Sequence, residues 1–211
     1  MAATQLTFLA KRLRRVGTLL AAIFLGSNAL LLAVLQPPHI TPGATDAVFV
    51  FAGDGDGHRL SAAIDLMVHE LSHQESLPHM VISHGSQRGR TAEVLAEICA
   101  ELGDQAKTQL PLLEVTCIVP YPTTTRGEAA AFARLAETNG WTSVIGVSSS
   151  YHAARVRTWL NFCMSDTEIQ VVGAPTQLTR QLITHELGGL LHAYAQPWCP
   201  PRLDGTASNF A

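Results

Sequence analysis

Five short runs of apolar and β-branched residues constrain the fold of this 211-residue chain most strongly. Each run has the composition of a strand that is buried on both faces. The runs cover residues 46–53, 80–84, 115–120, 143–148 and 168–174. Helical patterns fill the intervals and follow the last run, over about 59–73, 89–102, 126–139, 151–163 and 178–195. Strands that alternate with helices predict an α/β fold, a Rossmann-like three-layer sandwich with a mostly parallel sheet of five or more strands.

Small and ionisable residues follow the carboxyl ends of four of these runs. Right-handed crossovers place all the carboxyl ends at one edge of the sheet, where open α/β sheets bind their ligands. Gly, Ser and Thr are also common in turns and helix caps, but His, Arg and carboxylates in the same loops favour a pocket. The expected ligand-binding residues are Gly53, Asp54, Gly55, Arg59, Ser83, Gly85, Thr125, Ser149 and Arg155.

Acid–base chemistry at this edge would come from three candidate catalytic residues, His152, Glu128 and Glu93. His152 stands in the first turn of its helix, and we expect it to act as general acid or base with Glu93 or Glu128 as its orienting carboxylate. The alternative is a histidine that only caps its helix. Two arginines, Arg59 and Arg155, are suited to clamping a phosphate or carboxylate.

Metal binding is weakly indicated at two places. Asp54 and Asp56 would repel a bare phosphate and tolerate one bridged by a divalent cation, but loop aspartates commonly make Asx turns. Residues 69–73 read His-Glu-Leu-Ser-His, the HExxH pattern of zinc proteases. Helical periodicity puts both histidines opposite the apolar stripe of their helix, on its solvent face. We therefore predict no metal site, and the sequence identifies no cofactor.

The N-terminal region predicts a membrane anchor. Residues 16–35 carry no charge, and a helix of that length crosses a hydrocarbon core of about 30 Å. A basic cluster at 11–15 precedes the stretch, and the next Lys or Arg is Arg59. The positive-inside rule then places residues 1–15 in the cytoplasm, with a tether over 36–45 and an extracytoplasmic domain over 46–211. A cleaved signal peptide is the alternative.

Charge and cysteine content agree with that placement. Four of the 14 Lys and Arg precede residue 16, which leaves 10 positive charges against 17 negative ones in the remainder and argues against nucleic-acid binding. The four cysteines allow two disulfides in an oxidising compartment. Cys163 and Cys199 both fall near helix ends, so we favour that pair. Four buried free thiols are the alternative.

The loops resemble the YdcF-like family, which includes the SanA and ElyC envelope proteins. The resemblance covers residues 46–195 and is carried by a strand ending in Gly53, Arg59, Ser83-His84-Gly85, Glu93, Thr125-Arg126-Gly127-Glu128, and a run from Ser148 through Tyr151-His152 to Arg155. Gly127 and Glu128 depart from the family, which commonly has Glu and Asn there. The resemblance implies an anchored protein that supports envelope integrity and binds or processes a small anionic or lipid-linked envelope precursor. A non-catalytic scaffold or binding protein of cell-wall assembly is the alternative.

Overall fold

The computed structural model describes residues 11–12, 14–22, 25–26, 43–53, 57–71, 73, 76–84, 92–177 and 179–200. The chain divides into two compact units, Met1–Gln36 and Pro37–Ala211. In the first unit residues 14–22 are helical, and most of the predicted span beyond residue 22 lies outside the described residues. Within the described part of the chain, no helix combines the length and the apolar character that a bilayer crossing requires.

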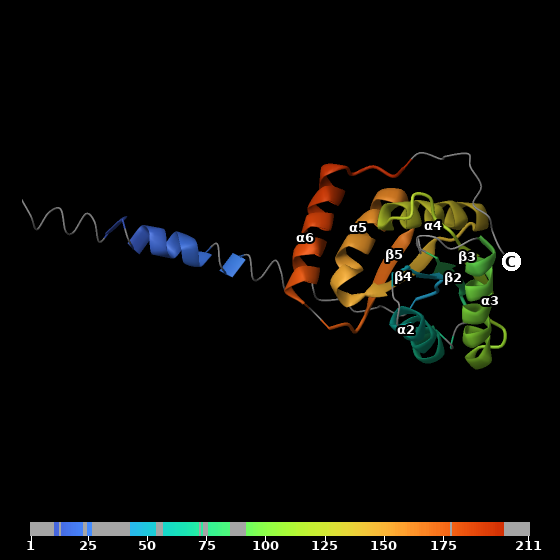
Figure 1. Ribbon diagram of the computed structural model, residues 1–211. Coiled ribbons are helices and arrows are strands. Elements are labelled where there is room, and N and C mark those ends of the chain that lie inside the picture. Colours follow the sequence, from blue (N-terminus) through green and yellow to red (C-terminus); the bar gives the residue numbers. More distant parts are fainter. Residues whose placement is uncertain are drawn as a thin grey trace, which may run out of the picture. The chain divides into compact units, whose positions relative to one another are not determined.

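A five-stranded, all-parallel sheet forms the centre of the second unit (Figure 1). Its strands are β1 (Ala47–Val50), β2 (His79–Ser83), β3 (Val115–Ile118), β4 (Ser143–Ser149) and β5 (Glu168–Ala174). They lie in the order β3-β2-β1-β4-β5. This order, with the chain reversing its direction of progress between β1 and β4, confirms the predicted Rossmann-like α/β sheet.

The helices also follow the predicted alternation. They are α2 (His58–Leu66), which continues into the π-helical η1 (Met67–Leu71), then α3 (Ala92–Gln109), α4 (Thr125–Asn139), the 3-10 turn η2 (Ser150–His152), α5 (Ala153–Cys163) and α6 (Arg180–Ala195). Helix α3 extends beyond the predicted end at residue 102. Gly103 lies inside this helix, and an added Cβ there would make an ordinary van der Waals contact with Val115 at 3.6 Å.

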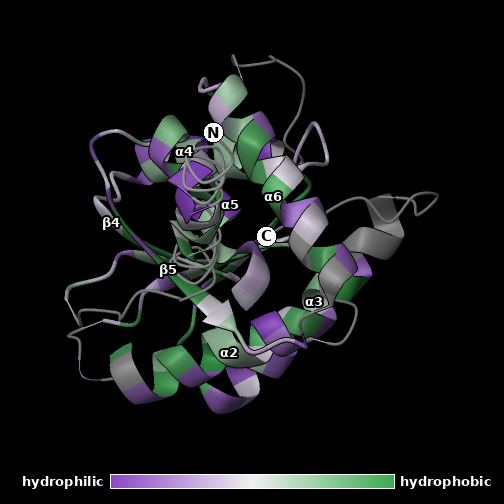
Figure 2. Cartoon of the chain, turned by 90° about the vertical axis from the view of Figure 1, so that its left-hand side faces the viewer, coloured by the Kyte–Doolittle hydropathy of each residue, from purple (hydrophilic) through white to green (hydrophobic). Residues whose placement is uncertain are grey.

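Apolar side chains cover both faces of the sheet. Phe49 on one face of β1 stacks on Phe132 of α4, with ring centroids 4.1 Å apart. On the other face, Val48 and Val50 join Leu60 and Ile64 of α2 in a second cluster. Adjacent residues of β1 thus serve opposite cores, as expected for a strand between two helix layers. The helices carry hydrophobic and hydrophilic residues side by side along their length, as amphipathic helices do (Figure 2).

Two disulfides connect elements that are distant in sequence. Cys163 is bonded to Cys199, which is the predicted pair, and Cys99 of α3 is bonded to Cys117 of β3. With both bridges formed, no cysteine among the described residues is free. In the chain-entropy model, loops of this size give about 3 kcal/mol of stabilisation for each bridge.

Two helical glycines provide a direct test of this packing. A Cβ at Gly127 would overlap the carbonyl oxygen of Pro122, whereas a Cβ at Gly188 of α6 would meet no atom within 4 Å. We expect Gly127→Ala to destabilise the protein by at least about 1–3 kcal/mol, the usual cost of overpacking. Gly188→Ala should stabilise it by roughly 0.5–1 kcal/mol, because alanine is the better helix former. Urea unfolding of both variants checks the pair, and equal shifts would contradict the described start of α4.

Candidate functional site

The candidate site lies where β1 and β4 end beside one another. The backbone N–H of Phe51 donates to the carbonyl oxygen of Val147 at 3.0 Å, so the two strands stay paired up to their carboxyl ends. Beyond that point β1 runs into Ala52 and Gly53, and β4 runs into η2. Doubly wound sheets bind ligands at such a reversal of strand order. The fold therefore brings the predicted loops of these two strands together.

Arg59 holds these two strand ends. Its side chain is buried, and its Nε donates to the hydroxyl of Ser149 at 3.0 Å. Its Nη1 donates to the carbonyl oxygens of Phe51 and Ala52. A buried cation needs such partners, because its desolvation is otherwise costly. Arg59 and Ser149, both predicted as ligand-binding residues, are thus bonded to one another across the strand reversal.

Gly53 permits this arrangement through its backbone conformation. Its φ of 103° lies in the region that favours glycine, and an added Cβ would sit 3.4 Å from Arg59 Nη1. Asp54, Gly55 and Gly85 lie outside the described residues, as does the side chain of Glu93. Their predicted contacts with a ligand stay predictions.

Glu128 is a buried carboxyl group in the first turn of α4, with 5% of its surface exposed. Its Oε1 accepts a hydrogen bond from the backbone N–H of Ala52 at 2.8 Å. Burial raises the pKa of Glu128 from 4.5 to about 7, against the lowering effects of the Ala52 amide, the Ser83 hydroxyl and the charges of Arg59 and Arg155. This side chain therefore titrates near neutral pH, as a general acid must.

His152 is oriented by Glu186 of α6. The imidazole is 6% exposed, and its Nδ1 lies 2.8 Å from Glu186 Oε2. A carboxylate only accepts hydrogen bonds, so Nδ1 carries the proton and the Nε2 lone pair is left for another donor. The Thr125 hydroxyl lies 3.2 Å from that Nε2. Glu186, His152 and Thr125 form a carboxylate–imidazole–hydroxyl chain.

Arg155 completes this cluster. Its Nη2 donates to Glu186 Oε1 at 2.9 Å. Arg155 Nη2 and Nε also lie 2.9 and 3.3 Å from His152 Nδ1, but a protonated Nδ1 cannot accept, so Glu186 Oε1 is the acceptor of the Nη2 donor. Gly189 makes room for this contact, because a Cβ there would sit 2.9 Å from the Cδ of Arg155.

Burial favours the neutral form of the His152 imidazole. Burial lowers the pKa of His152, and the charges of Arg155 and Arg59 lower it too, while Glu186 raises it. Burial acts to raise the pKa of Glu186, but its contacts with His152 and Arg155 outweigh that effect and the net shift is downward. The result is an ionised carboxylate that holds a neutral base.

Glu186 is the site residue that the sequence analysis did not identify. The expected orienting carboxylate was Glu93 or Glu128, but Glu128 is bonded to Ala52. A signal for Glu186 was present in its helix. It lies seven residues, or about two helical turns, before Ala193 on the buried face of α6, where an apolar residue is expected, and a buried carboxylate requires a partner.

Ser83 and the two histidines of the HExxH pattern are also among the described residues. Ser83 is buried at the end of β2, where its hydroxyl lowers the Glu128 pKa. The histidines of the HExxH pattern, His69 and His73, are exposed, as their helical positions predicted. One end of the sheet therefore carries both a neutral histidine and a carboxyl group whose pKa is raised to about 7.

Comparisons with known proteins do not extend this description. No family model matches the chain, and no curated protein matches it significantly. A crystal structure of a protein from the universal stress protein family from Burkholderia pseudomallei is similar in part, with 15% identity and a TM-score of 0.36. That likeness covers 63% of this chain and 100% of the other. A likeness of this size carries no information about the site.

The raised Glu128 pKa predicts a pH-dependent stability. The carboxyl group ionises near 4.5 when unfolded and near 7 when folded. Its contribution to stability is therefore complete below 4.5 and is lost as the pH rises towards 7, by up to about 1.4 kcal/mol per pH unit. Glu128→Gln cannot ionise and therefore does not lose this stability. Its free energy of unfolding should rise relative to that of the wild type as the pH increases from 5 to about 7, and the difference should then stay constant up to pH 8.

Thermal unfolding across that pH range measures the difference. Glu137→Gln is the matched control, because Glu137 is an exposed carboxylate on the same helix. A Glu128→Gln curve parallel to the wild-type curve would show that Glu128 is ionised throughout.

Proposed function

We propose that this protein is an acid–base enzyme, a hydrolase or transferase, in which His152 is the base and Glu128 the acid. The observation that carries the proposal is the chain of contacts from Glu186 through His152 to the Thr125 hydroxyl, at 2.8 and 3.2 Å. In the reaction, His152 Nε2 takes a proton from the attacking hydroxyl or water, and Glu186 stabilises the imidazolium that forms. Protonated Glu128 gives its proton to the leaving group.

The substrate that we propose is a phosphorylated cell-envelope metabolite or a lipid-linked precursor. Two arginine charges act on this site, since both Arg59 and Arg155 lower the pKa of Glu128. Their positive potential favours an anion. The resemblance to YdcF-like envelope proteins supports the same class of ligand.

We also propose that residues 16–35 anchor the protein in the cell membrane, with the α/β domain on the extracytoplasmic side. Two disulfides support an oxidising compartment. Residues 36–46 join the predicted span to β1, and at about 3.6 Å per residue they reach roughly 40 Å at most.

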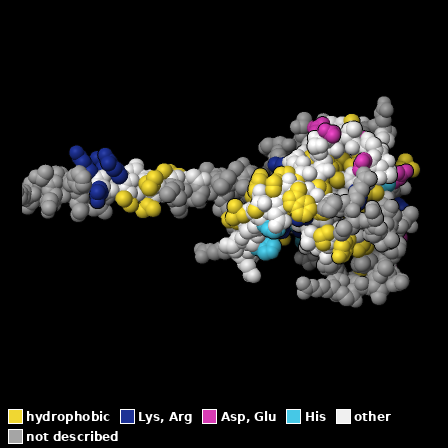
Figure 3. Space-filling model, turned by 90° about the horizontal axis from the view of Figure 1, so that it is seen from above, with side chains coloured by type: hydrophobic (Ala, Val, Ile, Leu, Met, Phe, Trp, Pro, Cys, Tyr) yellow, Lys and Arg dark blue, Asp and Glu magenta, His cyan; other side chains and the backbone are white. Residues whose placement is uncertain are grey.

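The outer face of α6 carries exposed apolar side chains of the kind that suit a membrane surface. Leu191 and Tyr194 are 72% and 63% exposed, and Trp198 just beyond the helix is also exposed. Residues 187–195 contain no Asp, Glu, Lys or Arg, and Figure 3 shows hydrophobic side chains gathered over α6. Tyr and Trp favour the membrane interface. We propose that lipid covers this face, which would bring Glu186 on the inner side of α6 close to lipid-linked substrates.

A non-catalytic binding or scaffold protein of cell-wall assembly is the second candidate. The observation that favours it is the use of arginine donors within the protein. Arg59 donates to Ser149 and to backbone carbonyls, and Arg155 donates to Glu186. Because these donors are already bonded within the protein, both arginines are explained as parts of the folded scaffold without any reaction.

Hydrolysis of p-nitrophenyl phosphate and bis(p-nitrophenyl) phosphate distinguishes these candidates. We expect His152→Ala to lower kcat/KM by about 10²–10⁴, the usual contribution of a general base, while His192→Ala on the outer face of α6 leaves it unchanged. The rate should fall on the acid side as His152 is protonated, below its usual pKa of 6.5, and on the alkaline side near 7 as Glu128 ionises. A folded wild type that turns over neither ester but binds inorganic phosphate would favour the scaffold.

Fluorescence of the full chain in vesicles tests the α6 surface. Lipids with brominated acyl chains should quench Trp198, and Trp198→Phe should remove most of that quenching. Trp159 is the control, because it is buried and Trp159→Phe should leave the quenching in place. Equal quenching of both variants would contradict the contact between α6 and lipid.

A further inference from the structure

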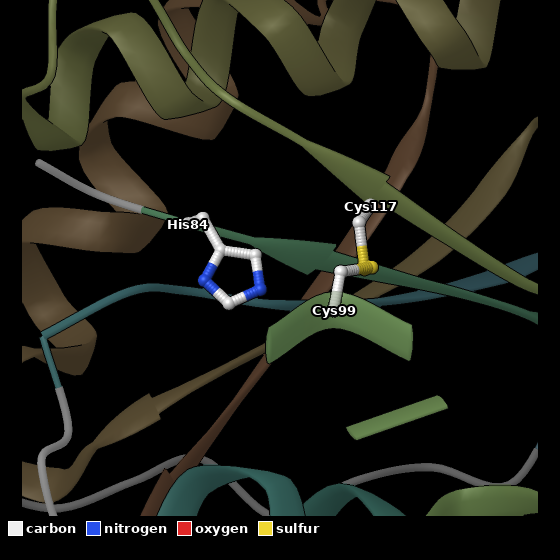
Figure 4. A group of neighbouring side chains, drawn as sticks. All are labelled: His84, Cys99 and Cys117. Carbon is white, nitrogen blue, oxygen red and sulfur yellow. A yellow bond between two sulfur atoms is a disulfide. The ribbon is translucent and has the colours of Figure 1, made fainter. Parts of the chain in front are cut away.

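A second cluster of reactive side chains lies beside the sheet, on the α3 side. Figure 4 shows the imidazole of His84 next to the disulfide between Cys99 and Cys117. All three residues are buried, and one potential ligand atom from each lies within 4.8 Å of the others. The proposed acid–base reaction uses none of these side chains.

The strand register holds these groups on one face of the sheet. Cys117 of β3 pairs with Ile82 of β2, and the backbone N–H of His84 donates to the carbonyl oxygen of Ile118 at 2.8 Å. His84 follows Ile82 by two residues and therefore projects to the same face. Helix α3 brings Cys99 over that face, with a Cα–Cα distance of 6.1 Å to Cys117.

This residue set matches a thiophilic metal once the disulfide is opened. Two thiolates and one imidazole are the three protein ligands of known open zinc sites. Bond lengths of about 2.3 Å to sulfur and 2.0–2.1 Å to nitrogen separate tetrahedral ligand atoms by roughly 3.5–3.8 Å. The three potential ligand atoms lie within 4.8 Å of one another, which is close to that separation. Zn²⁺ with two thiolates is also electrically neutral, which suits a buried position better than two bare thiolates.

We propose that His84, Cys99 and Cys117 bind one Zn²⁺ ion when the Cys99–Cys117 disulfide is reduced, and that disulfide and metal are alternative states of one site. A dithiol reductant supplies two electrons and two protons, is itself oxidised to a disulfide, and leaves Cys99 and Cys117 as thiols. Metal binding then releases one proton from each thiol. Water takes the fourth position on the ion.

The other disulfide provides the matched comparison. Within the described residues, Cys163 and Cys199 have no histidine or carboxylate placed to complete a comparable group. If reduction alone created metal sites, both pairs would bind. We expect binding only at Cys99 and Cys117, the pair that lies beside His84.

Cobalt titration of the reduced full chain tests the site, because tetrahedral thiolate–Co²⁺ complexes absorb visible light. After anaerobic reduction and removal of the reductant, we expect one Co²⁺ per chain, displaced by Zn²⁺. His84→Ala should weaken binding at least about tenfold, and Cys99→Ser should abolish the thiolate bands. Cys163→Ser combined with Cys199→Ser should leave binding unchanged.

Three results would overturn the proposal. The first is a reduced wild type that binds no Co²⁺, whether it stays folded by circular dichroism or unfolds. The second is Co²⁺ binding by reduced His84→Ala that is as tight as in the wild type. Mass spectrometry of the oxidised variant must then show that it keeps the Cys99–Cys117 disulfide. The third is binding that is lost with Cys163 and Cys199. His84→Gln repeats the second test if the alanine variant does not fold.

Discussion

A buried guanidinium at the reversal of strand order is the interaction on which the candidate site depends. Arg59 binds the carbonyl oxygens that end β1 and the Ser149 hydroxyl that ends β4. The turn that it holds also presents the Ala52 amide to Glu128. On the other side, Ser149 leads directly into the 3-10 turn that carries His152. This cation gives both strand ends a common hydrogen-bond partner in a region shielded from water.

Around that point, burial shifts two ionisable groups in opposite directions. Desolvation favours the neutral form of each, so it raises the pKa of Glu128 and lowers that of His152. Each group also keeps a hydrogen bond that orients it, from Ala52 to Glu128 and from His152 to Glu186. Such a divergence is how proteins obtain an acid and a base at one pH. The covering helices α4 and α6 are therefore as much part of the site as the strand ends.

Sequence reasoning was most successful where the signal is local. Strand β5 was predicted at its observed bounds, and the apolar stripe that includes Leu60 and Ile64 was correctly assigned to the buried face of its helix. It was less successful with α3, whose expected end at residue 102 lies seven residues before the observed end at Gln109. Gly103 lies within the helix, and a Cβ there would make only an ordinary van der Waals contact with Val115, so a glycine in the sequence does not by itself mark a helix end.

The sequence by itself determined the alternation of strands and helices, the edge of the sheet at which polar loops gather, and the presence of His152 and Glu128 among them. Periodicity and crossover handedness are local properties, so they can be read from neighbouring residues. Only the tertiary structure decided which groups meet there. Glu186 reaches His152 from 34 residues away and Arg59 reaches Ser149 from 90. Such pairs depend on how α6 and α2 pack against the sheet, which no local sequence pattern specifies. Burial then requires each polar group to have a partner, because an unpaired polar group is costly to desolvate.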